Sequence, residues 1–392
     1  MPKKRKSLLP DDPSQGWRTY CRHPDHMMHG HRVELLVDAS QAYPAMLQAV
    51  DSAERTVLMD SYIFNYDTAG ERFRDALMRA AERGVKTYLI VDAVGTMHVP
   101  DFFFEQMIEA GVHVLRYRRL APWRRSFGIL RRNHRKMLVV DGRLGFAGGL
   151  NIGAEWLSVE EGGHGWHDIH VLVEGPAATE LSRLSMSTWH GHGNIYLEPK
   201  AFLPPVAPAG NEYVNIVGSR ERRKRKAIRQ SYLQAIRQAK RYIYIANAYF
   251  LPDTGFRRAL KNAVKRGVDV RVMVPQKSDI LSVQLASQSL YGRLLRTGVR
   301  IFLWGDAVLH AKTATIDDEW ATVGSFNIDH RSWTMNLEVN VNAVGSKIPG
   351  QLREVFLKDQ ERCTALSIEQ WRRRPIFLRL LESFFHLFRR WM

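Results

Sequence analysis

The sequence predicts an α/β protein made of two tandem lobes, related by a duplication, each a mostly parallel sheet flanked by helices. The motif His-x-Lys-x₄-Asp occurs twice, from His134 to Asp141 and from His310 to Asp317. Short apolar runs also alternate with amphipathic segments in the same order in both halves. Strands that alternate with helices favour largely parallel, buried sheets.

The duplication extends well beyond the two motifs. An amphipathic helix ends near Arg55 in the first half and near Arg241 in the second. A later pair of helices stops at Gly84 and Gly267, the residue type that most often caps a helix C-terminus. In chain order, the matched pairs are the strands 56–63 and 242–249, the helices 71–83 and 255–266, the strands 85–91 and 268–274, and the strands 112–117 and 299–304.

The repeat divides the chain into five parts. We expect a basic N-terminal tail (1–30), a first lobe (31–196), a Pro-rich linker (197–210), a second lobe (211–365) and a basic amphipathic C-terminal helix (366–392). Because each lobe carries one motif, a single site at the lobe interface would take half of its groups from each repeat.

Composition restricts the partners of this chain. Its formal net charge is +17, from 57 Lys and Arg against 40 Asp and Glu, which favours nucleic acid or an anionic membrane surface. Two cysteines, Cys21 and Cys363, are too few for a disulfide framework or a zinc site, so a reducing compartment is expected. Since no run reaches 18 apolar residues and no secretory signal is evident, we expect a soluble or peripheral protein.

The motif residues suit chemistry on a phosphodiester. Alternation along a strand puts His134 and Lys136 on one face, and the same holds for His310 and Lys312. A Gly-rich or Gly-Ser turn follows each motif and ends in Asn151 or Asn327, which could bring N–H groups to a phosphate. An isolated histidine on a strand would more simply be a core residue, but the duplication argues against that alternative.

These residues resemble the signature of the phospholipase D superfamily, His-x-Lys-x₄-Asp followed by Gly-[Gly/Ser]-x-Asn, present twice over about residues 31–362. The resemblance implies a covalent mechanism that uses no metal and no other cofactor. It assigns His134 as the nucleophile that forms a phosphohistidine and His310 as the general acid and base, although the spacing leaves open which histidine attacks. The implied phosphate-binding residues are Lys136, Lys312, Asn151, Asn327 and Ser325.

Two acidic residues are expected to orient the histidines. In the family an acid follows each motif histidine by about 30 positions. Glu338 follows His310 and Asp168 follows His134 at about this spacing, so each is expected to serve the histidine of its own half. The alternative is that both are ordinary acids at strand ends.

The motif aspartates, Asp141 and Asp317, belong to the catalytic signature. Each stands at the end of its predicted strand, next to Gly142 or Asp318, in a turn-forming pair. Within the signature we therefore expect both to position the turn.

Two segments combine arginine with aromatic side chains, which suits contact with a lipid surface. One precedes His134, and the other is the C-terminal helix with its apolar stripe. The candidate contact residues are Trp123, Arg124, Arg125, Phe127, Phe377, Phe384, Phe388 and Trp391. The alternatives are a polar surface loop or nucleic-acid contact for the first segment, and docking on the protein's own core for the second.

Within the superfamily, residues 247–252 and 329–338 resemble bacterial cardiolipin synthases, in particular the type without N-terminal transmembrane helices. The resemblance implies transfer of a phosphatidyl group from phosphatidylglycerol to a second phosphatidylglycerol, with release of glycerol. It implies a peripheral protein on the cytoplasmic face of the bacterial membrane, with no nucleic-acid partner. The alternatives are a phospholipase D-type hydrolase and a nuclease, and the acceptor, the oligomeric state and the role of the Arg-rich segment 219–226 remain open.

Overall fold

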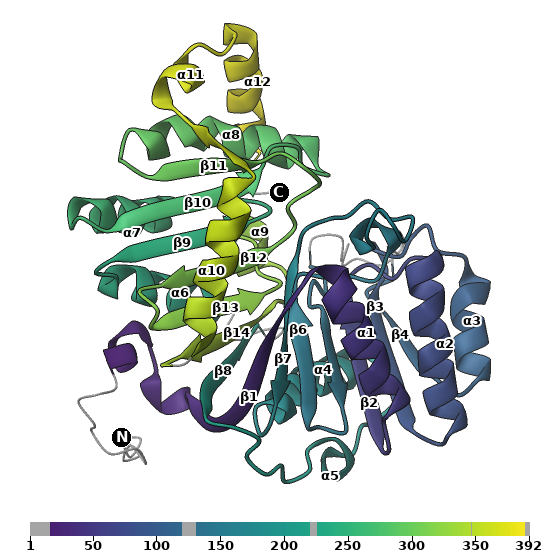
Figure 1. Cartoon of the computed structure of the whole chain (residues 1–392). Coiled ribbons are helices and arrows are strands. Elements are labelled where there is room, and N and C mark those ends of the chain that lie inside the picture. Colours follow the sequence, from purple (N-terminus) through teal and green to yellow (C-terminus); the bar gives the residue numbers. More distant parts are fainter. Residues whose placement is uncertain (1–15, 120–130, 220–225, 346, 389–392) are drawn as a thin grey trace.

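The computed structural model describes residues 16–119, 131–219, 226–345 and 347–388 (Figure 1). Within these ranges the strands form one continuous 15-stranded sheet that runs through both lobes. Its order is β15-β11-β10-β9-β12-β13-β14-β8-β1-β7-β6-β5-β2-β3-β4. Because β1 and β8 lie next to each other at its centre, the first strands of the two lobes form the junction between them.

The first lobe contains the following elements in chain order: β1 (Met28–Val37), α1 (Asp38–Asp51), β2 (Thr56–Ser61), α2 (Thr68–Glu82), β3 (Lys86–Asp92), α3 (Asp101–Glu109), β4 (His113–Tyr117), β5 (Met137–Val140), β6 (Leu144–Gly148), β7 (Ile169–Glu174) and α4 (Ala178–His192). The short helix α5 (Pro199–Phe202) follows between the lobes.

The second lobe repeats this order: β8 (Glu212–Gly218), α6 (Ala227–Gln238), β9 (Tyr242–Asn247), α7 (Thr254–Lys265), β10 (Asp269–Pro275), α8 (Leu281–Leu295), β11 (Arg300–Trp304), β12 (Lys312–Ile316), β13 (Trp320–Gly324), α9 (His330–Thr334), β14 (Val339–Val344) and α10 (Lys347–Glu361). The chain then adds β15 (Cys363–Leu366), α11 (Ile368–Arg372) and α12 (Ile376–Leu387). The duplicated α/β architecture is confirmed.

The expectation of mostly parallel sheets is wrong, because the sheet is mixed. Parallel pairing in the described chain is confined to β2-β3-β4 and β9-β10-β11, where a helix crosses between successive strands. The motif strands β5 and β12 instead begin antiparallel hairpins. Asp141 and Gly142 in one turn, and Asp317 and Asp318 in the other, have positive φ angles, which suit the tight connections that only antiparallel strands accept.

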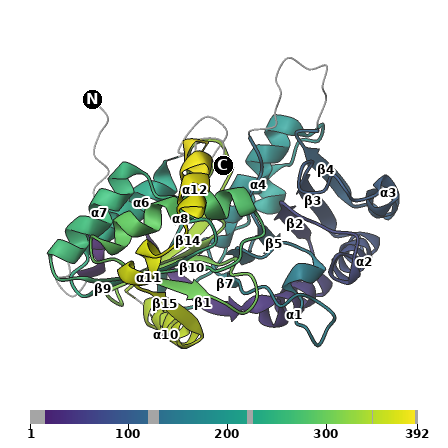
Figure 2. The same cartoon turned by 90° about the horizontal axis from the view of Figure 1, so that it is seen from above.

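Helices cover both faces of the sheet (Figure 2). In the first lobe α1, α2 and α3 pack on one face around a core that includes Phe73 and Phe103, whereas α4 covers the other face. In the second lobe α6, α7 and α8 pack around Tyr232 and Phe256, and α10 takes the position that α4 has in the first lobe. The motif strands therefore lie between two apolar layers, which hold their polar ends rigidly.

Most predicted helices and strands agree with the observed ones within a few residues. At the C-terminal ends of α2 and α7, Gly84 and Gly267 have φ angles of +86° and +87°, as the predicted caps require. The sequence interpretation omitted β1 and β8. Both strands lie at the centre of the sheet, and their partners come from distant parts of the chain.

Three expectations about the segments outside the lobes need correction. Residues 16–30 are not a free tail, because Trp17 and Tyr20 are buried against the second lobe. The linker 197–210 is partly packed, since Phe202 contacts the ring of Tyr88. The C-terminal segment 366–392 is not one helix, because Pro375 separates α11 from α12.

A candidate active site between the two lobes

His134 lies just before β5, at the boundary between the lobes. Its backbone N–H donates to the carbonyl of Leu337 at 2.9 Å, and Asn133 forms an isolated parallel bridge with the same residue. The segment that leads into β14 of the second lobe therefore holds the first motif histidine in place.

His310 has the reciprocal arrangement just before β12. Its backbone N–H donates to the carbonyl of His167 at 2.7 Å, and His167 and Leu309 form a parallel bridge. The ring of Trp156 meets the imidazole edge to face, with the centroids 5.3 Å apart. The segment that leads into β7 of the first lobe thus holds the second motif histidine.

The two orienting carboxylates are exchanged between the lobes. Glu338 contacts Nδ1 of His134 through both oxygens at 3.1 Å, and Asp168 Oδ2 lies 2.6 Å from Nδ1 of His310. The expected pairing of each acid with the histidine of its own half is therefore wrong. Both carboxylates are completely buried, and a neutral imidazole that donates its Nδ1–H to one leaves Nε2 without that hydrogen.

Burial favours the neutral form of both imidazoles. It lowers the pKa of His134 to about 4, although the Glu338 carboxylate opposes the shift. Burial, together with the Lys312 ammonium, also holds the pKa of His310 well below its ordinary value. Burial raises the pKa of Glu338, but the contact with His134 outweighs this effect and the net shift is downward. In both half-sites burial thus works against a positive charge on the imidazole.

The two motif lysines lie behind the histidines. Lys136 Nζ donates to the carbonyl of His134 at 2.8 Å, and Lys312 Nζ contacts both the carbonyl and Nδ1 of His310. Burial lowers the pKa of Lys136 well below its ordinary value and that of Lys312 to about 8. Neither lysine lines the cavity described next, so in this structure both place a buried amino group behind the imidazoles.

A cavity of about 380 Å³ opens onto both histidines. Asn151 and Asn327, one from each repeat, also line it. Asn151 Oδ1 accepts a hydrogen bond from the N–H of Ile63 at 3.1 Å, which leaves its amide hydrogens available. Asn327 Oδ1 is buried without a hydrogen-bond partner among the described residues. The cavity therefore combines two imidazoles with two amides, the groups needed to bind and attack a phosphodiester.

Ser325 does not fit the phosphate-binding role expected for it. Its hydroxyl donates to Glu338, accepts the N–H of Val339 at 3.1 Å, and does not line the cavity. Its position suits a role in holding the carboxylate that contacts His134.

The motif aspartates also lie away from the cavity, at the other ends of β5 and β12. Asp141 accepts three backbone N–H groups, at 2.8 to 3.1 Å, from residues 54–56. Asp317 accepts the equivalent three from residues 240–242 and also the Tyr20 hydroxyl at 2.7 Å. Both aspartates therefore close the turn between a helix and the strand that follows it, and neither lines the cavity.

Several cavity residues were not singled out from the sequence. Tyr62 and Tyr249 follow β2 and β9, and Asp279 accepts a hydrogen bond from the Tyr249 hydroxyl at 2.6 Å. Asp329 and Arg331 also line the cavity, and burial raises the pKa of Asp329 to about 7. An aromatic residue just after each of the two matched strands was the available signal, but only the fold shows that these strand ends meet. In the described part of the chain, no group of three His, Cys, Asp or Glu side chains could hold a metal ion.

The candidate membrane residues divide into two groups. Trp123, Arg124, Arg125, Phe127 and Trp391 lie outside the described residues. Phe377, Phe384 and Phe388 belong to α12 or its C-terminal cap and are exposed. The opposite side of α12 packs on α8, where Phe385 contacts Leu251, Val283 and Ala286 and His386 meets Ser289. No helix in the described ranges has the length and apolar character needed to cross a membrane.

Comparison with known proteins agrees with this geometry. Residues 46–176 and 232–360 each match the family described as cardiolipin synthase, PLD-like domain. The chain is 33% identical over 354 residues to a cardiolipin synthase of Geobacillus thermodenitrificans, covering 89% of this chain and 70% of the relative. It is 32% identical over 357 residues to the major cardiolipin synthase of Bacillus subtilis, covering 90% and 73%.

A solved structure resembles the fold at low sequence identity. The phosphatidylserine synthase of Haemophilus influenzae superposes with a TM-score of 0.73 at 12% identity, covering 92% of this chain and 95% of that chain. At this identity the likeness supports the shared two-lobed fold alone.

Proposed function

The chain belongs to the cardiolipin synthase family with phospholipase D-like domains, and we propose that it transfers a phosphatidyl group from one phosphatidylglycerol to the hydroxyl of another. It is thus a phosphatidyltransferase of phospholipid biosynthesis. The observation that supports the reaction best is the pair of buried imidazoles, each held at Nδ1 by a carboxylate of the opposite lobe, facing one cavity.

In the first step, Nε2 of His134 attacks phosphorus and the bond from phosphorus to the glycerol oxygen breaks. His310 donates a proton to that oxygen, so glycerol leaves and the phosphatidyl group remains on His134 as a phosphohistidine. Because burial lowers the pKa of both imidazoles, we propose that the anionic substrate raises the pKa of His310, which then takes up from solvent the proton that it donates.

In the second step, the hydroxyl of a second phosphatidylglycerol gives its proton to His310 and its oxygen attacks phosphorus. The bond from phosphorus to His134 then breaks, which releases cardiolipin and the neutral histidine. Asn151 and Asn327 hold the non-bridging oxygens, and Lys136 and Lys312 stabilise the developing charge from behind the imidazoles.

The site lies beside an apolar surface, which supports a lipid substrate. Ile280 and Val283 line the catalytic cavity at the beginning of α8, and Leu281 next to them is 65% exposed. The same helix supports α12, whose Phe377 and Phe384 are 67% and 53% exposed. We propose that α12 and the beginning of α8 rest on an anionic membrane, so that the protein is peripheral and receives its lipid directly from the surface.

The deciding experiment measures glycerol released and cardiolipin formed when the full chain is mixed with phosphatidylglycerol vesicles. Both products are expected in equal amounts, and both should be lost in His134→Ala. Release of phosphatidic acid instead of cardiolipin would indicate a hydrolase. Cleavage of plasmid DNA that depends on His134, without lipid turnover, would contradict the proposal in favour of a nuclease.

A further inference from the structure

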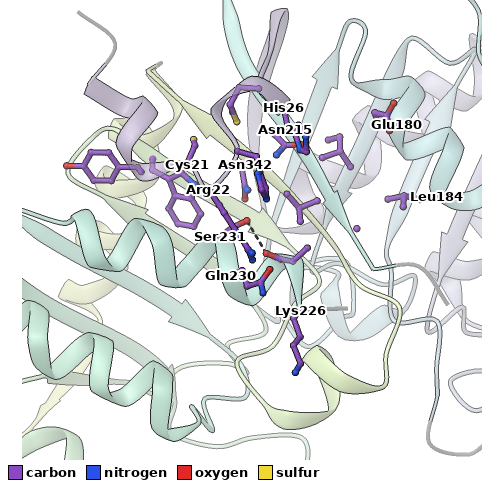
Figure 3. A pocket seen from close by; sticks show the side chains of 18 of the residues that line it. Cys21, Arg22, His26, Glu180, Leu184, Asn215, Lys226, Gln230, Ser231 and Asn342 are labelled. Carbon is purple, nitrogen blue, oxygen red and sulfur yellow. Dashed lines mark hydrogen bonds between the residues drawn. The ribbon is translucent and has the colours of Figure 1, made fainter. Parts of the chain in front are cut away.

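A second, larger cavity of about 760 Å³ lies between α4 and α6, beside β8, and none of the described residues lines both this cavity and the catalytic one (Figure 3). Its floor includes Asn215 on β8 and Asn342 on β14, which are direct partners in the sheet. The segment 20–27 forms one wall, so the cavity takes residues from both lobes and from the N-terminal segment.

The floor offers two amides that have no partner. Asn342 is only 4% exposed, and its side chain makes no hydrogen bond with any residue that the structure describes. The Asn215 side chain beside it is half-buried and likewise makes no hydrogen bond with a described residue (Figure 3). Burying an amide without a partner costs free energy, so Asn342 is suited to a polar ligand, and Asn215 lies beside it on the same floor.

The charge of the wall is strongly positive. Arg22, Arg131 and Lys226 line the cavity, and none of them forms an ion pair or side-chain hydrogen bond within the described ranges. Glu180 is the one carboxylate in the described lining, and it pairs with Arg183 at 3.0 Å. Burial raises the pKa of the Cys21 thiol to about 12, so that this group stays neutral. The wall therefore carries exposed cationic groups that have no counter-charge among the residues that the structure describes.

Helix α6 adds to this potential. It begins at Ala227 in the cavity lining, and no side chain caps its first turn. The N–H groups at the start of a helix favour an anion, and here they lie beside Lys226.

The duplicated unit has an equivalent groove that lacks this character. It lies between β1 and α10, encloses about 350 Å³, and carries Lys347 and Lys358 balanced by Glu34 and Glu354. Of these two grooves in the described chain, the α4–α6 cavity is the larger and the one with the excess of basic side chains.

We propose that the α4–α6 cavity binds a phosphate-bearing anion, with Arg22, Arg131, Lys226 and the first turn of α6 around the phosphate and the two asparagines around its polar substituents. Met27, Leu184 and Trp320 supply apolar wall for the carbon part of the ligand. This inference does not depend on the proposed reaction, because it uses no catalytic residue.

Hydrogen exchange of the full chain tests the proposal, with peptides from residues 20–27 and 226–231 as the local readout. The probes are inorganic phosphate, short-chain phosphatidylglycerol below its micellar concentration, and short-chain phosphatidylcholine at the same concentration as a zwitterionic control. Exchange in both peptides should slow with at least one anionic probe. Slowing by phosphatidylglycerol alone identifies a lipid headgroup, whereas slowing by inorganic phosphate as well identifies a free phosphate compound.

The matched variants are Arg22→Gln/Lys226→Gln in the cavity and Lys347→Gln/Lys358→Gln in the equivalent groove, which remove the same charge. The first pair should raise the apparent Kd for the anionic probe, measured from exchange in these two peptides, by roughly tenfold or more. The second pair should leave this Kd unchanged. Asn342→Ala should also weaken binding. Absence of slowing with both anions, or equal slowing in both double variants, would overturn the proposal.

Discussion

Glu338 lies with both carboxylate oxygens 3.1 Å from Nδ1 of His134, a residue 204 positions earlier in the chain and in the other lobe. Asp168 makes the reciprocal contact with His310. Each half of the duplication thus carries a histidine that it cannot orient by itself. Each motif histidine therefore takes its orienting carboxylate from the other half of the duplication.

The first prediction concerns this exchange. Glu338→Gln removes the charge that holds Nδ1–H of His134, and kcat should fall on the order of 10²- to 10⁴-fold. Because the carboxylate raises the pKa of His134, its loss should lower that pKa and move the acidic limb of the pH–rate profile to lower pH. Asp168→Asn should reduce kcat similarly through His310. The exposed Glu34→Gln is the control, and an unchanged rate in Glu338→Gln would refute the orienting role.

The second prediction concerns the covalent intermediate. During turnover, His134 should carry the phosphatidyl group, and an alkaline quench should preserve the phosphohistidine for peptide mass spectrometry. His134→Ala and His310→Ala should each lower activity by several orders of magnitude, since the two residues act as one unit. An adduct found on His310 would reverse the assignment of nucleophile and acid.

The third prediction separates stability from catalysis in the motif. Asp317→Ala leaves three backbone N–H groups and the Tyr20 hydroxyl without their acceptor, so unfolding free energy should fall by about 1–3 kcal/mol. The same change at Asp141 should have a similar effect. Urea denaturation measures it, while kcat per folded molecule should stay within about twofold. A large loss of kcat in fully folded protein would show that these aspartates act in the reaction.

The fourth prediction uses His167, which bridges Asp38 at 2.8 Å and Asp359 at 2.9 Å. Burial opposes its charge, but the two carboxylates outweigh burial and raise its pKa to about 10. A raised folded-state pKa gives stability that is complete below about pH 6.5, the unfolded value, and is lost as the pH rises toward 10. The stability difference between wild type and His167→Gln should therefore shrink from pH 6 to pH 10. A difference that stays constant would contradict the charged bridge.

The fifth prediction concerns the exposed face of α12. Phe377→Ser/Phe384→Ser should weaken binding to phosphatidylglycerol vesicles on the order of tenfold or more, because both rings are positioned to enter a lipid surface. The control is Phe102→Ser/Ile108→Ser, which removes two exposed apolar side chains of α3. Sedimentation with vesicles measures the partition. Equal loss of vesicle binding in both double variants would contradict a specific membrane contact through α12.

The sequence alone determined the repeat, the two motif histidines and most elements of both lobes. These features are local, because helix and strand periods, glycine caps and motif spacing each depend on residues that lie close together in the chain. Gly84 and Gly267 illustrate this, since each was recognised as a cap from its position and each adopts the positive φ that the cap needs.

Only the tertiary structure decided how these parts combine. Spacing paired Asp168 with His134 and Glu338 with His310, whereas packing of β1 against β8 places each acid in the opposite half-site. The pairing of β13 with β14 also places the Ser325 hydroxyl on Glu338, and the fold turns the motif lysines away from the cavity. Contacts between distant segments depend on the relative position of two lobes, and no short-range pattern along the chain carries that information.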